Sequence, residues 1–217
     1  MLQKMDGSKK MSLNSQVSLA VLASGKGSNL SALINAINNE NIANANIALV
    51  ISNKKDSYAL TIAREAKIPA VSIERSLFNS DEEYDLFLLE KLKEFNIDVV
   101  LFAGYLRIIT PPFLKAYENK ILNIHPSLLP DFGGKGMYGM KVHQAVISAN
   151  SEKSGCTVHL VTEEIDGGPV LAQACVSIKS DDTAESLAAK VLKEEHKLYP
   201  KAVNEFISTL LLNKNKK

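Results

Sequence analysis

Apolar runs alternate with amphipathic stretches between residues 17 and 125. The apolar runs are rich in Val, Ile and Leu and are predicted as strands at 17–23, 46–52, 70–73, 98–104 and 121–125. Between them, apolar residues at helical spacing predict helices at about 30–37, 57–66 and 80–95. Strands that are apolar on both faces and alternate with helices indicate a parallel sheet that is covered on both sides.

The pattern changes after Pro130, where a glycine-rich loop begins. A helix near 141–149 and two strands at 156–162 and 169–178 follow. The short link between these strands predicts an antiparallel pair, and the chain closes with a helix from Thr183 and another near 200–212. We therefore predict a single α/β domain with a Rossmann-like first half, a mostly parallel central sheet and an antiparallel C-terminal part. It spans 17–212, between a flexible leader or tag at 1–16 and a polar tail at 213–217.

Composition narrows the classes of partner. Of 217 residues, 46% are hydrophobic and 23% charged, and the formal net charge is +1, which gives no support to a nucleic-acid or membrane-surface partner. The first residues lack the apolar segment of a secretory signal, and no apolar run is long enough to cross a bilayer. A cytoplasmic protein is expected, with Cys156 and Cys175 as buried small hydrophobes.

The glycine-rich turn SGKGSNL, residues 24–30, directly follows the first predicted strand and opens a helix. Gly25 and Gly27 permit a tight turn, and a helix N-terminus favours an anion. The spacing is not that of a Walker A loop, and only half of a dinucleotide fingerprint is present. A phosphate monoester is therefore favoured over a dinucleotide, and the alternative is a plain strand-to-helix turn.

Polar residues interrupt the fifth strand in ILNIHPSLLP, residues 121–130. Asn123 and His125 are two positions apart, so strand alternation points both side chains the same way. An amide beside an imidazole can stabilise an oxyanion and move a proton. The alternative is a core histidine with its hydrogen bonds satisfied.

A carboxylate precedes two glycines and a proline in EEIDGGPV, residues 163–170. Asp166 is either the side chain of an Asx turn or a carboxylate held against His125, where it would raise the pKa of the imidazole. The segment AGYLRIITP, residues 103–111, is either a buried connector or an apolar slot for a flat ligand. His159 shares a strand face with Thr157 and is a weaker candidate to face this site, and the four histidines form no metal-binding pattern.

These segments, in this order, resemble the folate-dependent formyltransferases. The resemblance rests on SGKGSNL, ISNK, AGYLRIITP, LNIHPSLLP, GCTVHLVTEEIDGGPV and EEHKLYP, and it covers roughly residues 18–200. It implies that Asn123, His125 and Asp166 are catalytic. It also implies that Gly27, Ser28 and Asn29 hold the phosphate of glycinamide ribonucleotide, while Glu195 holds the glycinamide end.

The resemblance further implies a folate pocket. Its expected residues are Leu106, Arg107, Ile108, Ile109, Asn123, Thr162, Glu163, Glu164 and Ile165. Two features depart from the family pattern. Asp81 stands where some members have an arginine that reaches the folate, and the loop at 131–143 is longer than in some members.

The implied activity is formyl transfer from 10-formyltetrahydrofolate to the amine of glycinamide ribonucleotide in purine biosynthesis, without a metal. The implied partners are these small molecules alone, bound by a monomer or homodimer. The alternatives are a formyltetrahydrofolate hydrolase, an enzyme that formylates methionyl-tRNA, and a nucleotide-binding module without catalysis. A tRNA-acting relative would carry a further C-terminal domain, yet the chain stops about 50 residues after DGGPV.

Overall fold

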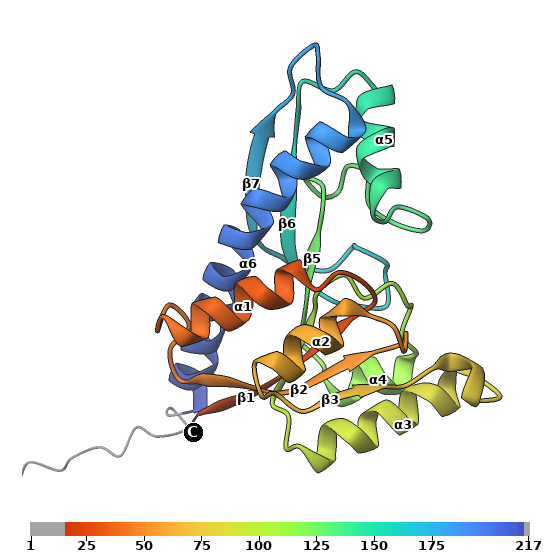
Figure 1. Cartoon of the computed structure of the whole chain (residues 1–217), viewed down its shortest axis with the longest axis vertical. Coiled ribbons are helices and arrows are strands. Elements are labelled where there is room, and N and C mark those ends of the chain that lie inside the picture. The colour runs from red at the N-terminus through yellow and green to blue at the C-terminus, as the bar shows by residue number, and fades with distance from the viewer. Residues whose placement is uncertain (1–15, 215–217) are drawn as a thin grey trace, which may run out of the picture.

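Seven strands form one sheet in the order β3-β2-β1-β4-β5-β6-β7 (Figure 1). The computed structural model describes residues 16–214. The strands are β1 (Val17–Ala23), β2 (Ala45–Ser52), β3 (Ala70–Ser72), β4 (Val99–Phe102), β5 (Ile121–His125), β6 (Lys153–Leu160) and β7 (Val170–Ser177). The helices are α1 (Ser28–Asn38), α2 (Tyr58–Glu65), α3 (Asp81–Glu94), α4 (Pro111–Ala116), α5 (Met140–Ser148) and α6 (Ala184–Lys214), with a 3-10 turn η1 (Arg75–Leu77). The predicted α/β class is confirmed.

Strand pairing changes from parallel to antiparallel after β5. Strands β1 to β5 pair in parallel, whereas β6 pairs antiparallel with both β5 and β7. Asn123 therefore has Phe102 as its neighbour on the parallel side and His159 on the antiparallel side. The predicted antiparallel C-terminal pair is confirmed, and its first strand begins at Lys153, three residues earlier than expected.

Both faces of the sheet are covered, because alternate residues of each central strand point to opposite sides. Leu19 and Val21 pack in a core cluster with residues of α1, α2, α5 and α6. Ala20 and Leu22 belong to a second cluster, with residues of α3 and α4. Continuous apolar strands of this kind are what the sequence pattern predicted.

One long helix replaces the two that were predicted at the C-terminal end. Pro200 stands where the second of the two predicted helices was to begin, and a proline inside a helix removes a backbone hydrogen bond. Instead α6 runs through Pro200 and crosses the length of the molecule (Figure 1). The neighbouring Tyr199 is fully buried, and its hydroxyl lies 3.0 Å from the carbonyl oxygen of Phe102 and 3.1 Å from that of Leu122. Residues before and after Pro200 are buried against the sheet, and this packing keeps the helix continuous.

Smaller differences concern the ends of the chain and the connectors. The expected leader lies outside the described residues except for Gln16, and the tail expected from residue 213 begins inside the last turn of α6. The helix α4, with Pro111 and Pro112 in its first turn, was not predicted. Cys156 is buried as expected, but Cys175 is exposed because it lies on the outer face of the edge strand β7. Within residues 16–214, no helix has both the length and the apolar character of a membrane span.

Candidate active site

A cavity of about 490 Å³ opens at the carboxyl ends of β1, β4 and β5, where open parallel sheets bind ligands. Every residue assigned from the sequence lines it: Gly27, Ser28, Asn29, Leu106, Arg107, Ile108, Ile109, Asn123, His125, Thr162, Glu163, Glu164, Ile165, Asp166 and Glu195. The sequence assignments therefore fall in one place in the fold, and their individual roles remain predictions.

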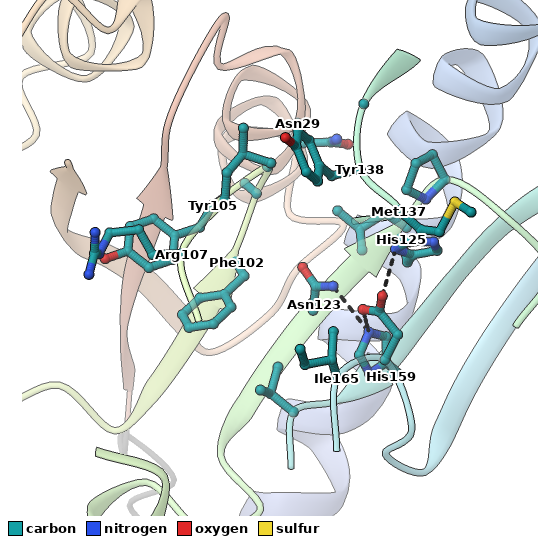
Figure 2. Close-up of a pocket in the computed structure, with 18 of the residues that line it drawn as sticks. Asn29, Phe102, Tyr105, Arg107, Asn123, His125, Met137, Tyr138, His159 and Ile165 are labelled. Atoms are coloured by element: carbon teal, nitrogen blue, oxygen red, sulfur yellow. Dashed lines mark hydrogen bonds and ion pairs between the residues drawn. The ribbon is translucent and has the colours of Figure 1, made fainter. Parts of the chain in front are cut away.

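Asn123 and His125 both face the cavity, as strand alternation requires (Figure 2). The side-chain nitrogen Nδ2 of Asn123 lies 3.1 Å from Nε2 of His159, its cross-strand neighbour on β6. The other ring nitrogen of His159 lies 2.9 Å from the carbonyl oxygen of Leu160, which can only accept a hydrogen bond. In the neutral ring Nδ1 therefore carries the proton, and Nε2 accepts from Asn123.

His125 is held between a carbonyl and a carboxylate. Its Nε2 lies 3.0 Å from the carbonyl oxygen of Phe132, so this nitrogen carries a proton. Its Nδ1 lies 3.5 Å from Oδ2 of Asp166. Burial lowers the pKa of His125, and the charge of Asp166 opposes this only in part. Asp166 raises the pKa of His125 as predicted, but desolvation of the imidazolium outweighs this effect, so the pKa is lowered overall.

Asp166 occupies a backbone conformation that few residues adopt. Its φ is +58°, in the left-handed region that aspartate tolerates better than most side chains. Two residues later, glycine is required at position 168, because an added Cβ on Gly168 would lie 1.9 Å from the carbonyl oxygen of Leu160. This turn aims the carboxylate between His125 and His159.

The carboxylate of Asp166 also holds a loop. Its Oδ2 accepts a hydrogen bond from the backbone N–H of Gly134 at 2.9 Å. Burial alone would raise the pKa of Asp166, but the imidazoles of His159 and His125 in their protonated forms and the N–H of Gly134 together lower it. Asp166 is therefore an ionised group at neutral pH, whereas His125 is neutral.

The turn after β1 forms one end of the cavity. Gly27 is the N-cap of α1 with φ +72°, and a Cβ at this position would lie 2.8 Å from the Cα of Ala59. The carbonyl of Gly25 accepts a hydrogen bond from Ser57 Oγ at 3.0 Å, which fixes the turn against the start of α2. Only glycine satisfies both the conformation and the close approach at position 27.

Two of the predicted substrate residues contact each other at this end. Nδ2 of Asn29 donates to Oε2 of Glu195 at 2.7 Å, which joins α1 to α6. Both side chains are 8% exposed, and burial raises the pKa of Glu195. The remaining oxygen of Asn29 has no hydrogen-bond partner within the described part of the chain. A buried acceptor without a partner is costly, so this corner is suited to a ligand that donates hydrogen bonds.

The opposite end of the cavity is apolar and contains one positively charged side chain, that of Arg107. Leu106 and Ile108 are 52% and 64% exposed, and Phe102, Val161 and Ile165 also line this part. Exposed large apolar side chains in a cavity indicate an apolar ligand surface. Arg107 lies over the ring of Tyr84 at 4.7 Å and pairs with Asp81, which also pairs with Arg75. Asp81, which departs from the family pattern, thus contacts a predicted folate residue.

Two parts of the site were not assigned from the sequence. His159 contacts both Asn123 and Asp166, and only strand alternation with Thr157 pointed to it. The loop at 134–139 also lines the cavity, and its glycines were the only signal. As for metals, the part of the chain that the structure describes contains no cluster of three or more His, Cys, Asp or Glu side chains suited to hold one.

Known proteins resemble this chain over most of its length. The family described as "Formyl transferase" matches residues 17–203. The phosphoribosylglycinamide formyltransferase of Haemophilus influenzae is 40% identical over 188 residues, which cover 87% of this chain and 86% of that protein. The chloroplastic phosphoribosylglycinamide formyltransferase of Arabidopsis thaliana is 42% identical over 85% of this chain. The chain spans only 63% of that protein and 59% of a similar Vigna unguiculata protein.

Solved structures agree in both fold and sequence. Glycinamide ribonucleotide transformylase 1 from Symbiobacterium toebii has a TM-score of 0.85 and 37% identity, covering 90% of this chain and 89% of that one. Phosphoribosylglycinamide formyltransferase from Brucella melitensis has a TM-score of 0.81 and 42% identity, with coverages of 88% and 95%.

Proposed function

The chain belongs to the formyl transferase family, and on that premise we propose that it transfers a formyl group from 10-formyltetrahydrofolate to the amine of 5′-phosphoribosylglycinamide. The product is formylglycinamide ribonucleotide, an intermediate of purine biosynthesis. One observation carries this proposal. Asn123 and His125 face the cavity from one strand, with Asp166 against His125, between a glycine-rich turn and an apolar wall.

The apolar end of the cavity fits a folate. A pteridine is a flat ring system, and Phe102, Ile108 and Ile165 offer apolar surface to it. The polar edge of such a ring needs hydrogen-bond partners, which the backbone of 162–165 can supply. When bound, the folate supplies the formyl group.

The glycine-rich end fits the amine substrate. The N-terminus of α1 presents backbone N–H groups to the cavity, and these favour a phosphate monoester. Glu195 and the partnerless oxygen of Asn29 are acceptors suited to the N–H groups of the glycinamide. The substrate amine then lies toward the centre of the cavity, near Asn123 and His125.

The catalytic roles follow from the hydrogen bonds. As the substrate amine attacks the formyl carbon, negative charge grows on the formyl oxygen, and the free N–H of Asn123 donates to it. The lone pair on Nδ1 of the neutral His125 accepts the proton that the amine loses. The resulting imidazolium has both N–H groups satisfied, by the carbonyl of Phe132 and by Asp166. His125 then returns the proton to the leaving nitrogen, so the enzyme ends each cycle unchanged.

An acceptor panel tests the proposal against its rivals. Purified protein is incubated with 10-formyltetrahydrofolate and either glycinamide ribonucleotide, water alone or initiator methionyl-tRNA, and formyl product and released folate are measured. We expect turnover with glycinamide ribonucleotide that exceeds the other two by at least about 100-fold. Equal folate release in water would identify a hydrolase, formylated tRNA would identify a tRNA-acting enzyme, and the absence of all three products would leave a binding module.

The proposal also includes the partners and the location. The protein acts on small molecules without nucleic acid or a membrane, which the near-neutral charge supports. Its proposed state is a monomer or homodimer. We propose a cytoplasmic location, although the names of the plant relatives place those proteins in chloroplasts. Fractionation of cells that express the natural gene tests the location.

A further inference from the structure

A second glycine-rich loop faces the turn after β1 across the cavity. It has the sequence GGKGMYG, residues 133–139, and joins the β5 exit to α5. Its residues 134–139 line the same cavity as residues 25–29. Figure 2 shows Met137 and Tyr138 at the end of the cavity where Asn29 lies, away from Arg107 and Phe102. This end is the one that the proposed function gives to the ribonucleotide.

Glycines on both sides of Lys135 fix the shape of the loop. Gly134 and Gly136 each have φ +89°, a conformation that side chains rarely adopt, and an added Cβ at either position would have open space around it. Glycine is therefore needed here for backbone conformation rather than for room. The two glycines hold Lys135 at the rim of the cavity.

The loop is fastened to the catalytic groups. The N–H of Gly134 donates to Asp166 at 2.9 Å, and the carbonyl of Phe132 accepts from His125 at 3.0 Å. Met137 N–H donates to the carbonyl of Gly134 at 3.1 Å and closes a turn around Lys135. The position of Lys135 is therefore set through Asp166 and His125, which also have proposed roles in formyl transfer.

Lys135 brings a positive charge that no described carboxylate neutralises. The ion pairs within residues 16–214 involve neither Lys135 nor Lys26, the two lysines that line the cavity. Arg107, the other cation in the lining, is engaged by Asp81. In the lining of the same cavity, the buried Asn29 keeps an oxygen without a partner among the described residues. Both observations indicate that this end is completed by a ligand that carries negative charge and hydrogen-bond donors.

We propose that Lys135 binds the phosphate of the ribonucleotide substrate. Residues 133–139 form the second wall of the phosphate site, facing Gly27–Asn29, and the ammonium group of Lys135 supplies the counter-charge that backbone N–H groups alone do not. This inference deepens the proposed function and rests on it for the identity of the substrate. A lysine ammonium on a flexible stem suits this role, because it needs only proximity to the phosphate and no fixed fork geometry.

The test compares Lys135→Met with Lys115→Met. Lys115 is an exposed lysine on α4 outside the cavity, so the pair is matched in charge change. Lys135→Met should raise the KM for glycinamide ribonucleotide by about 10- to 100-fold, the range for loss of a charged hydrogen bond. The KM for 10-formyltetrahydrofolate and kcat should stay within about twofold. Lys115→Met should match the wild type, and Lys135→Arg should recover most of the affinity.

Direct binding separates this inference from the proposed function. Ribose 5-phosphate and ribose are titrated into each protein and followed by NMR, without any formyl transfer. Preference for ribose 5-phosphate that is lost in Lys135→Met supports the inference, even if the wild type fails to formylate glycinamide ribonucleotide. Equal behaviour of wild type and Lys135→Met toward ribose 5-phosphate overturns it, even if formyl transfer is found.

Discussion

Asn123 and His159 are cross-strand neighbours whose side chains meet, with Nδ2 of the amide 3.1 Å from Nε2 of the imidazole. The carbonyl of Leu160 fixes the proton of the ring on Nδ1, so Nε2 is left as an acceptor. One N–H of Asn123 is thereby used, and the other is free to point into the cavity. A residue of the antiparallel strand β6 thus fixes the orientation of the Asn123 amide on β5.

Replacing His159 by Phe should therefore lower kcat by about fivefold, with little change in either KM. The reason is that a neutral hydrogen bond contributes about 1 kcal/mol, and its loss lets the amide of Asn123 rotate. Steady-state kinetics with both substrates measures this effect. His196→Phe is the control, because His196 lies outside the cavity. An unchanged kcat in His159→Phe would show that Asn123 needs no partner.

Truncating the groups nearest the reacting atoms should have larger effects. Asn123→Ala removes the donor to the formyl oxygen and His125→Ala removes the proton acceptor, and each should lower kcat by about 100- to 1,000-fold. His125 is not expected to hold either substrate in the ground state, so His125→Ala should keep both KM values within a few-fold. Asn123→Ala should also raise the KM for 10-formyltetrahydrofolate, because Asn123 is an expected folate-pocket residue. Near-wild-type turnover in either variant would refute the catalytic assignment. Circular dichroism verifies that the variants fold.

The pH dependence should report the neutral form of His125. Burial lowers its pKa below the ordinary 6.5, so the ring is neutral at pH 7 and kcat/KM should fall only as the pH drops through this lowered pKa. The charge of Asp166 raises this pKa in part, so Asp166→Asn should lower it further and move the acidic limb to still lower pH. NMR titration of the His125 ring measures the pKa directly. A limb at the same pH in both proteins would exclude the coupling.

Glu195 should affect one substrate only. Glu195→Gln keeps the shape but replaces an acceptor beside Asn29, so the KM for glycinamide ribonucleotide should rise by about tenfold or more. The KM for 10-formyltetrahydrofolate should not change, because the apolar wall is at the other end of the cavity. Glu194→Gln, one residue earlier and outside the cavity, is the matched control. Equal changes in both KM values would instead indicate a general loss of structure.

Tyr199 should matter for stability rather than for chemistry. Its buried hydroxyl reaches the carbonyl oxygens of Phe102 and Leu122, so Tyr199→Phe leaves buried acceptors without their donor and should cost about 1–3 kcal/mol. Urea unfolding measures the free energy. Tyr117→Phe, which removes a hydroxyl bonded to the carbonyl of Ile97 in a half-buried position, should cost less. The reverse order would argue against the contact between α6 and the sheet.

The sheet could be predicted because its signals are local. Continuous apolar strands, intervening helices and the alternation of Asn123 and His125 can all be recognised within short windows of sequence. The position of Asp166 near His125 was one of two interpretations of the local sequence, since 41 residues separate them, and the resemblance favoured it. Local rules also failed at Pro200, where packing of α6 on the sheet overrides the usual helix-breaking effect of proline.

The parts that escaped prediction depend on register and on loops. His159 reaches Asn123 only because β5 and β6 pair in one particular register, which no sequence pattern specifies. The hydrogen bond from Gly134 to Asp166 joins two loops 32 residues apart. The lowered pKa of His125 could not be predicted, because it depends on how deeply the ring is buried. The nearby carboxylate by itself would raise this pKa.

The bond between Gly134 and Asp166 has a thermodynamic consequence. It joins the loop at 133–139 to the group that faces Nδ1 of His125, so anion binding at the loop and protonation of the imidazole are linked equilibria. Such linkage is reciprocal: an anion that moves the pKa of His125 by about one unit must itself bind about tenfold differently to the two protonation states. The affinity of a non-reacting phosphate, measured across pH, would therefore report the protonation state of His125 without any turnover.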